Sequence, residues 1–448
     1  MSADAVPAEQ PVIDIAFVER LLQATPQDAG AWSSLGVLLR RAGRLPAALA
    51  CHHRGLEVDP GHPAVWSNLG NARTDQGLHD QAVAAHLRAY TLGPDSLSYA
   101  FNCAIGLRKA GDFTRTLEVL ERALRLDPGN SQLLWERALT RLQTGDYADG
   151  FADYEVRRRI PSYRNRVAPG PAWDGGPLHG RTILLTTEQG FGDALLTARY
   201  VPMVKARGGR VLFECHNELR RVFAGLEGVD GFVEAGAPFP AYDVHASLMS
   251  LPHLFGTTID TVPAPVRLTV PEDARAKAAR LVPGPDGTLK VGIVWSGRVT
   301  FADNIRRATT LARFLEFLEV PGVRLYSVQK GPPEEQLQAL GTSLLVTPLG
   351  PQLNDFAETA AVLERLDLVL MTDSSVAHLA GSLGTPVWNL VQPVPYWIYG
   401  FEGERTPWYP SMRLLRQGFD ENWDPVFEQA KRDLRTLAAG GPFAGRSA

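Results

Sequence analysis

The amino-acid sequence predicts a helical repeat array followed by two α/β halves, each built on a doubly wound parallel sheet. Glycines recur every 34 residues in the first third of the chain, at Gly43, Gly77, Gly111 and Gly145. Over the rest of the chain, short apolar strand patterns alternate with helical patterns, which is the order of elements in parallel sheets. A stretch rich in proline and glycine at 283–287 divides this second part in two.

Length and composition fit a multidomain globular protein. The chain has 448 residues, which is room for about three domains at ~150 residues each. Its 45% apolar content is ordinary for a protein that buries cores. A net charge of −4 and a pI of about 6.2 lack the basic footprint of nucleic-acid-binding proteins, so we expect no nucleic-acid partner. Cys51, Cys103 and Cys215 lie far apart without metal-type spacing, which favours a reducing compartment.

The expected location is the cytoplasm. No apolar run approaches the ~18–20 residues that span a bilayer. The N-terminus lacks the basic and apolar regions of a signal peptide. We therefore expect a cytoplasmic protein without a transmembrane segment.

The 34-residue period defines repeated helix pairs. Pro60, Pro94 and Pro128 keep the step of the glycines, and so do Trp32 and Trp66. One helix pair cannot bury its own apolar face, so neighbouring pairs must stack into a superhelix with a concave groove. This pattern resembles the tetratricopeptide repeat. We place repeats at 29–62, 63–96, 97–130 and 131–164, after an N-terminal segment and half-repeat at 1–28.

Asparagines mark the expected groove. Asn68 and Asn102 are 34 residues apart on successive first helices, which line the groove, and Asn71 shares the face of Asn68. Such amides are suited to hold an extended peptide by its backbone, and they resemble the asparagine ladder of the O-linked N-acetylglucosamine transferases. The alternative is that these residues are polar only because water wets the groove.

A basic run follows the repeats. It contains five arginines between Arg157 and Arg166 and leads into a segment at 165–180 that is rich in proline and glycine. We interpret the arginines as a solvated face, with a docking patch as the alternative, and 165–180 as a linker.

The first α/β half, at 181–283, is organised around the stretch 181–199. A short apolar strand leads through Glu188, Gln189, Gly190 and Gly192 to Asp193 at the start of a helix. A parallel strand that feeds a helix through a glycine turn places such an acid at the carboxyl edge of the sheet, where open α/β folds bind ligands. The turn matches neither G-x-G-x-x-G nor a P-loop.

The second half, at 288–440, repeats this design. Strand patterns occur at 290–295, 324–329, 343–346, 366–371 and 385–391, and several end in turns rich in serine or glycine. Two Rossmann-like halves in sequence indicate two sheets facing a cleft. That architecture resembles the GT-B glycosyltransferases.

Several strings carry a closer family resemblance. The string 373–381, followed by 384–388, resembles the donor-binding signature of glycosyltransferase family 9, the heptosyltransferase family. The turn 188–193 is similar to that family's Gly-Asp motif. The strings 295–297, 329–331 and 408–413 resemble the subgroup with N-terminal tetratricopeptide repeats. The resemblance implies an inverting transferase that moves a sugar from a nucleotide-diphosphate donor to a protein or glycan acceptor presented by the repeats.

The resemblance also implies roles for particular residues. A helix that starts at Ser374, Ser375 and Val376 offers free amides and a positive dipole end to a donor diphosphate. The alternative is that these residues only cap the helix and that His378 is a histidine of the core. Arg307 and Lys330 would neutralise charge on the leaving diphosphate, or would simply be solvated. The expected donor side is completed by Ser296, Gly297, Gln329 and Asp373.

Asp193 matches the position of the proposed catalytic base. A carboxylate there would take the proton of an acceptor hydroxyl, whereas the alternative is that it only stabilises the helix start. Glu188, Gln189, Gly190 and Gly192 would form the acceptor-side loop. There is no Asp-x-Asp and the histidines are scattered, so we expect no metal and no cofactor besides the substrate nucleotide sugar.

One departure from the family pattern leaves alternatives open. Repeat-bearing relatives show histidine, aspartate and arginine-serine where this chain has Phe301, Asn304, Arg307 and Ala308. Three explanations stay open: the donor differs from that of these relatives, Asp303 substitutes for the missing aspartate from one residue away, or this protein has lost activity. The competing functions are a scaffold with a degenerate transferase half, and a GT-B sugar-nucleotide epimerase.

Ser375→Asp tests the donor site. A carboxylate at this helix start would repel a diphosphate, so stabilisation by nucleoside diphosphates should disappear while the melting temperature of the free protein stays nearly unchanged. A ligand at 100 times its dissociation constant stabilises by about 2.7 kcal/mol, which a thermal-shift screen detects. Nucleotide stabilisation that survives the substitution would place the donor site elsewhere.

Overall fold

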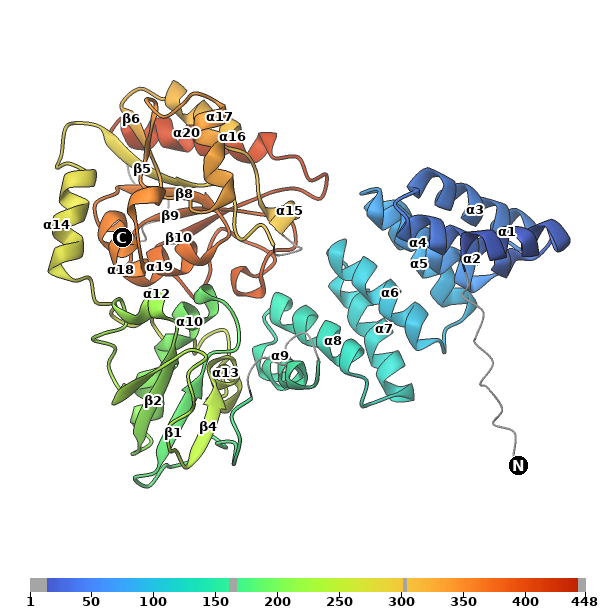
Figure 1. The fold of residues 1–448 in the computed structure, drawn as a ribbon, viewed down its shortest axis with the longest axis horizontal. Helices are drawn as coiled ribbons and strands as arrows, with labels where there is room; N and C mark the ends of the chain where they lie inside the picture. The colour runs from blue at the N-terminus through green and yellow to red at the C-terminus, as the bar shows by residue number, and fades with distance from the viewer. Residues whose placement is uncertain (1–13, 161–166, 301–303, 442–448) are drawn as a thin grey trace, which may run out of the picture. The chain divides into compact units, whose positions relative to one another are not determined.

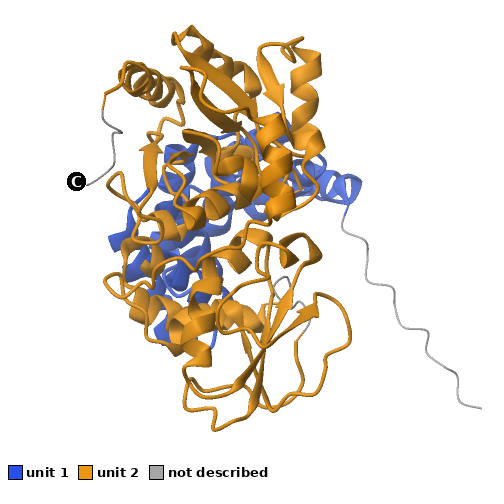
Figure 2. Cartoon of the chain, turned by 90° about the vertical axis from the view of Figure 1, so that its left-hand side faces the viewer, with its two compact units in different colours: residues 1–140 blue, residues 141–448 orange. Residues whose placement is uncertain are grey.

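The computed structural model describes residues 14–160, 167–300 and 304–441. The chain divides into two compact units, 1–140 and 141–448, which Figure 2 shows in blue and orange. This division falls inside the repeat predicted at 131–164, so the second helix of that repeat belongs to the second unit.

The first unit is the predicted repeat array. Its helices come in pairs that begin at the predicted repeat boundaries (Figure 1). They are α1 (Ile15–Ala24), α2 (Ala29–Arg41), α3 (Leu45–Val58), α4 (Pro63–Asp75), α5 (His79–Leu92), α6 (Leu97–Lys109) and α7 (Phe113–Leu126), and α8 (Ser131–Thr144) crosses into the second unit. The periodic glycines have φ between 73° and 87°, the left-handed region that favours glycine in a helix-to-helix turn.

A second glycine in each of the first two repeats admits a histidine ring. A Cβ atom at Gly36 or Gly70 would lie 2.5 Å from the ring of His52 or His86, respectively. Both rings are buried, at 0% and 4% exposure. Burial lowers the pKa of each imidazole to about 4, so both are neutral at neutral pH.

The first sheet of the second unit has the strand order β3-β2-β1-β4, and all pairs are parallel. The strands are β1 (Thr182–Thr186), β2 (Arg210–Cys215), β3 (Gly231–Glu234) and β4 (Val244–Ser247). Helices around it are α9 (Tyr147–Tyr154), the 3-10 turn η1 (Glu155–Arg159), α10 (Phe191–Thr197), α11 (Val201–Lys205), α12 (Asn217–Arg220) and α13 (Leu251–Leu254). Part of the predicted linker pairs with this sheet, because the Trp173 amide donates to the His245 carbonyl at 2.8 Å.

The second sheet has the order β10-β9-β8-β5-β6-β7, again parallel throughout. Its strands are β5 (Leu289–Val294), β6 (Val323–Ser327), β7 (Val346–Pro348), β8 (Leu368–Thr372), β9 (Val387–Val391) and β10 (Met412–Arg416). Its helices are α14 (Glu272–Leu281), α15 (Asn304–Arg307), α16 (Leu311–Leu315), α17 (Gln336–Ala339), α18 (Phe356–Leu363), α19 (Ser375–Leu383) and α20 (Asp424–Ala438). This strand order is that of a Rossmann fold. The predicted fold class is therefore confirmed.

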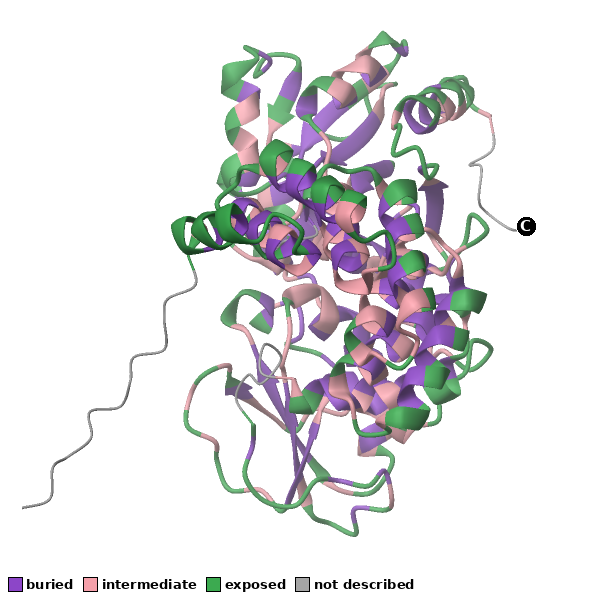
Figure 3. Ribbon diagram, turned by 90° about the vertical axis from the view of Figure 1, so that its right-hand side faces the viewer, coloured by how far each residue is buried: buried purple, intermediate pink, exposed green. Residues whose placement is uncertain are grey.

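The cores follow the sheets. Figure 3 shows buried residues along the strands, and one cluster joins Trp295, Phe314 and Phe427 beneath the second sheet. Within the described segments, no helix has both the length and the apolar character needed to cross a membrane.

The buried histidines predict acid sensitivity of the first unit. Their folded pKa lies below the unfolded value of 6.5, so the unfolded chain binds protons first and stability falls as pH drops from about 6.5 towards 4. At pH 5 each histidine should cost on the order of 1–2 kcal/mol relative to pH 7. Hydrogen exchange in peptides from α2 to α5, compared at the two pH values, measures this cost.

The double variant His52→Leu with His86→Leu should flatten this dependence, because Leu120 already fills the equivalent position of the third repeat. His253→Gln, at an exposed histidine of the second unit, is the control. Unchanged acid sensitivity in the double variant would contradict the assignment.

Candidate active site

Asp193 lies in the first turn of α10, directly after the turn that follows β1. Its Oδ2 accepts a hydrogen bond from the Gly190 amide at 3.0 Å, so the carboxylate closes the start of the helix. Its Oδ1 accepts a hydrogen bond from the Tyr396 hydroxyl at 3.0 Å. Because Tyr396 belongs to the second α/β half, this carboxylate connects the two halves.

The surroundings of Asp193 make it a stronger base than an ordinary carboxylate. Burial raises the pKa of its carboxyl from 3.8 to about 6, the hydrogen bonds from Tyr396 and Gly190 oppose that rise, and the charges of Asp373 and Glu188 add to it. A group with this pKa is mostly ionised at neutral pH and can still accept a proton.

The start of α19 faces the same region from the second half. Ser374 is the N-cap, and its Oγ accepts a hydrogen bond from the Val376 amide at 3.3 Å. Ser374, Ser375 and Val376 are partly exposed. The predicted helix start, with amides suited to an anion, is therefore present. Its binding of a diphosphate stays a prediction.

His378, one turn into α19, packs against Gly192, directly before Asp193. A Cβ atom at Gly192 would lie 2.8 Å from the His378 ring, so the close approach requires glycine. The His378 Nδ1 lies 3.0 Å from the Tyr409 hydroxyl. Burial lowers the pKa of His378 to about 4, so the ring carries no charge toward a diphosphate at neutral pH.

Asp373 and Arg307 meet beside the start of α19. Arg307 Nη1 donates to Asp373 Oδ2 at 3.1 Å, and the Tyr399 hydroxyl donates to Asp373 Oδ1 at 2.7 Å. Burial and the nearby Asp373 charge raise the pKa of Tyr399 well above 10, so it stays a donor. The structure thus brings together the predicted cation and the predicted acid of the donor side.

Asn304 and Gln329 hold the turn after β5. Gln329 Oε1 accepts a hydrogen bond from the Ser296 amide at 3.0 Å, and its Nε2 donates to the Ser296 carbonyl at 3.0 Å. Asn304 Oδ1 accepts a hydrogen bond from the Gly297 amide at 3.0 Å, and its Nδ2 donates to Ser296 Oγ at 3.1 Å. Asn304, which departs from the family pattern, therefore has a structural role here. Phe301 and Asp303 lie outside the described residues.

Lys330 is held by backbone. Its Nζ donates to the Gly350 carbonyl at 2.9 Å and to the Leu353 carbonyl. It follows β6, which β5 separates from β8 and Asp373. The structure does not join Lys330 to Arg307 as a pair of cations, and its role toward a diphosphate stays a prediction.

The candidate residues collect at two topological switch points. The strand order reverses between β1 and β4 in the first sheet and between β5 and β8 in the second. The turn 187–190 follows β1, Ser296 and Gly297 follow β5, and Asp373 follows β8. Open α/β folds bind ligands at such points. Because α10 packs on α19, the two sets of residues adjoin (Figure 1).

The turn before Asp193 bonds to α9 and η1, at the end of the fourth repeat. Glu188 forms an ion pair with Arg157, and Gln189 Nε2 donates to the Tyr154 hydroxyl at 3.2 Å. The interpretation of the basic run as solvated is wrong for Arg157, which is 1% exposed, whereas Arg158 and Arg159 are exposed as expected. The remaining arginines of the run, at 164 and 166, lie outside the described residues.

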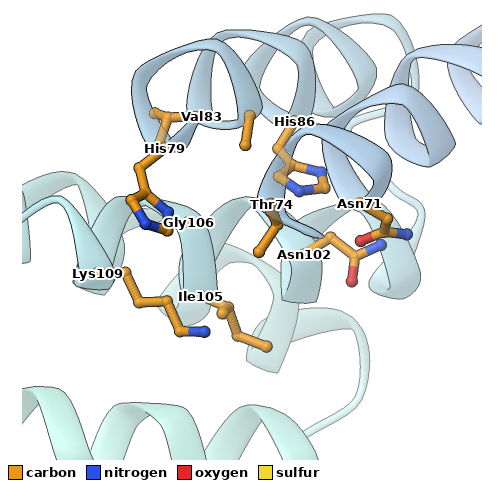
Figure 4. A pocket seen from close by; sticks show the side chains of 10 residues that line it. Asn71, Thr74, His79, Val83, His86, Asn102, Ile105, Gly106 and Lys109 are labelled. Atoms are coloured by element: carbon orange, nitrogen blue, oxygen red, sulfur yellow. The ribbon is translucent and has the colours of Figure 1, made fainter. Parts of the chain in front are cut away.

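The groove asparagines link neighbouring repeats. Asn68 Nδ2 donates to Ser33 Oγ at 2.9 Å, and Asn102 Nδ2 donates to Ser67 Oγ at 3.0 Å. Asn71 and Asn102 line a pocket of the first unit, with His79 and Lys109 on its other side (Figure 4). Peptide binding by these amides stays a prediction.

Sequence reasoning missed the tyrosines and Arg157. Tyr396 and Tyr399 lie between β9 and β10, directly before and at the end of the 3-10 turn η8 (Trp397–Tyr399), where no motif marks them. A run of aromatic residues just after a buried strand was the available signal. Among the side chains that the structure describes, no group of three or more histidine, cysteine or acidic residues is arranged to hold a metal.

Fold and site together define the class of protein. A tetratricopeptide-repeat array precedes two Rossmann-like sheets whose switch points adjoin, an arrangement of the GT-B type. A family model described as "Tetratricopeptide repeat" matches residues 16–52, 46–96 and 104–162, which confirms the predicted repeats.

Comparison with known proteins also finds a relative of this chain. Protein FlbA from Caulobacter vibrioides is 28% identical over 382 residues, and the match covers 78% of this chain and 63% of FlbA. This chain therefore spans less than two thirds of that relative's length.

Solved structures resemble each part separately. A glycosyl transferase family 9 protein from Veillonella parvula has 14% identity and a TM-score of 0.46, and the match covers 60% of this chain and 100% of that one. YrrB, described as a TPR protein with an unusual peptide-binding site, has 16% identity and a TM-score of 0.30, with 33% of this chain and 76% of that one covered. The strand orders of the two sheets define the α/β part as Rossmann-like.

Gly192→Ala tests the contact between the halves. The new methyl group would overlap the His378 ring, which should cost about 1–3 kcal/mol despite the better helix propensity of alanine. Gly190→Ala is the matched control, because its Cβ would meet only the Asp193 carboxylate at 3.7 Å. Thermal unfolding should separate the two variants. Equal melting temperatures would contradict the tight contact.

Proposed function

We propose that this protein is a glycosyltransferase that moves a sugar from a nucleotide-diphosphate donor to a hydroxyl of a protein or glycan acceptor. The observation that carries the proposal is the Asp193 carboxyl. It has a pKa of about 6, lies at the switch point of the first sheet and adjoins the start of α19. The motif resemblance to glycosyltransferase family 9 supports the same reaction class.

In the proposed step, the acceptor hydroxyl oxygen attacks the anomeric carbon from the face opposite the diphosphate. Its proton passes to Asp193 while the bond between the anomeric carbon and the diphosphate oxygen breaks. The electron pair leaves with the nucleoside diphosphate, and the configuration inverts. A positioned carboxylate base contributes ~10²–10⁴-fold to such a transfer.

Tyr396 orients the base. Its hydroxyl donates to Asp193 Oδ1, and burial raises the pKa of Tyr396 well above 10, so it keeps its proton. A fixed hydrogen bond of this kind holds the carboxylate in one orientation, which favours proton transfer from an acceptor placed beside it.

The donor side offers positive potential for the leaving group. The amides at the start of α19 and the Arg307 guanidinium, with an 18% exposed side chain, would offset the growing charge on the diphosphate. We propose that these groups act without a metal ion. The repeats, with Asn68 and Asn102 on successive first helices, would present the acceptor.

A protein-interaction scaffold is the second candidate function. The observation in its favour is that Asn304, Gln329 and Lys330 are engaged in bonds that hold backbone segments. Repeats of this type also suit protein partners. This candidate requires that no nucleoside diphosphate stabilises the protein.

Asp193→Asn tests the proposed base. Turnover of a nucleotide sugar, measured as transfer or as hydrolysis by water, should fall by roughly 10²–10⁴ while the donor dissociation constant barely changes. The wild-type kcat/KM should rise with pH through about 6, because the base must be ionised, and the variant should lose this dependence. Undiminished wild-type turnover in EDTA tests the independence from metal.

Stability provides the control. Because the folded pKa of Asp193 is raised, its charge disfavours the folded state above about pH 6, so asparagine should leave the melting temperature at pH 7.5 unchanged or higher. A fully active Asp193→Asn variant would remove this residue from the mechanism. A wild-type protein that neither binds nor turns over any donor would favour the scaffold.

A further inference from the structure

Arg157 lies on η1, just after the second helix of the fourth repeat, and its side chain is 1% exposed. A guanidinium has five N–H donors. Each has a partner: Nε donates to Glu188, Nη1 to the Tyr154 carbonyl at 3.2 Å and Glu155 Oε1 at 2.6 Å, and Nη2 to Ser250 Oγ at 2.8 Å and Ser247 Oγ at 3.5 Å. The fork geometry of this side chain is therefore fully used.

Three partners of Arg157 lie at the ends of two neighbouring strands. Glu188 follows β1, Ser247 is the last residue of β4, and Ser250 comes three residues later. The guanidinium therefore bridges the carboxyl ends of β1 and β4, which form the switch point of the first sheet. A side chain from the repeat helix pair occupies a position where open α/β sheets usually bind ligands.

Helix α9 also contacts the segment that holds the other oxygen of Asp193. The Trp408 Nε1 donates to the Tyr147 hydroxyl of α9 at 2.9 Å. The ring of Phe151, also in α9, packs edge-on against Trp397 with centroids 5.3 Å apart. Trp397 follows Tyr396, whose hydroxyl donates to Asp193. The last repeat helix thus contacts the segments that hold both oxygens of this carboxylate.

Stability alone gives little reason for such an arginine. Replacing a buried ion pair by well-packed apolar residues is often neutral or stabilising, whereas removal of one partner is costly. An apolar side chain would fill the site between β1 and β4 but would not hold Glu188 or the serines in fixed directions. The arrangement therefore favours a role for Arg157 in holding the surrounding groups in place.

We propose that Arg157 is a positioning residue, and that α9 and η1 of the fourth repeat brace the turn 187–190 so that Asp193 is correctly placed. This inference rests on the proposed function of Asp193 as the base. It makes the fourth repeat a working part of the transferase half, in addition to its place in the repeat array.

Loss of the guanidinium would have a signature that loss of packing lacks. Glu188 lies close enough to Asp193 for its charge to raise the pKa of that carboxyl. With the Arg157 charge gone, the Glu188 charge is no longer compensated, so the pH at which kcat/KM reaches half its plateau should move upward.

The experiment compares Arg157→Met, Arg157→Lys and Arg158→Met in the full chain. Arg158 is the matched control, because it is adjacent and its side chain is 43% exposed. Turnover, KM and the pH midpoint are measured with a nucleotide sugar, nucleoside-diphosphate binding by thermal shift, and local order by hydrogen exchange at 187–193.

Arg157→Met should lower kcat by on the order of 10²-fold, as a base displaced by about 1 Å does. It should raise the pH midpoint and speed exchange at 187–193, with nucleotide binding retained. Arg157→Lys keeps the charge but not the five-donor fork, so kcat should fall while the pH midpoint stays near that of the wild type. Arg158→Met should match the wild type.

A double variant, Arg157→Met with Glu188→Gln, guards against simple unfolding, since it removes both charges together. It should fold, keep the low kcat and exchange quickly at 187–193. Full kcat in Arg157→Met or in the double variant overturns the proposal. An equal effect of Arg158→Met would also overturn it. The same holds if Arg157→Met lowers stability but changes neither the pH midpoint nor the hydrogen exchange at 187–193.

These outcomes separate the inference from the proposed function. If Asp193→Asn is fully active while Arg157→Met is impaired and its turn exchanges quickly, the base assignment fails and the brace remains. If Asp193→Asn is inactive while Arg157→Met behaves as the wild type, the brace fails and the base assignment remains.

Discussion

The structure of the candidate site depends on one carboxylate that accepts a hydrogen bond from each of the two α/β halves. Asp193 gives one oxygen to the Gly190 amide of its own turn and the other to the Tyr396 hydroxyl of the second half. The carboxylate that caps the start of α10 therefore also connects the two α/β halves. Beside this junction α10 packs on α19 so closely that the His378 ring leaves no room for a side chain at Gly192. Burial of the junction raises the pKa of the carboxyl, so contact between the halves also produces the basicity.

The sequence predicted the fold well where periodicity reflects geometry. The glycines of the repeat have positive φ, so their spacing reports the backbone directly, and the helices begin where the repeats were placed. The strand expected at 343–346 forms instead at Val346–Pro348. Its apolar pattern was misleading because Leu344 and Leu345 are 100% and 60% exposed. The segment expected to be a linker is not fully solvated, because its apolar residues Trp173 and Leu178 are buried.

The site was predictable in part, for a similar reason. Asp193 and the start of α19 follow buried strands and precede helices, so local pattern was enough to place them at a sheet edge. Tyr396 could not be found this way, because it lies 203 residues from Asp193 and in a segment without regular structure. Arg157 was misinterpreted because a run of arginines is usually solvated, and only the strand ends that surround it show why it is buried. Hydrogen bonds between distant segments leave no period in the sequence.

The segment that pairs with β4 has a consequence for self-association. Since β4 lies at the edge of the first sheet, its backbone groups would offer a template for a strand from another chain. The Trp173 amide and the Pro171 carbonyl bond to His245 on that edge. The covering segment cannot itself extend the sheet freely, because Pro169 and Pro171 lack the N–H that a further strand would need. Residues 169–173 thus cover the open edge of the first sheet, where another strand would otherwise pair.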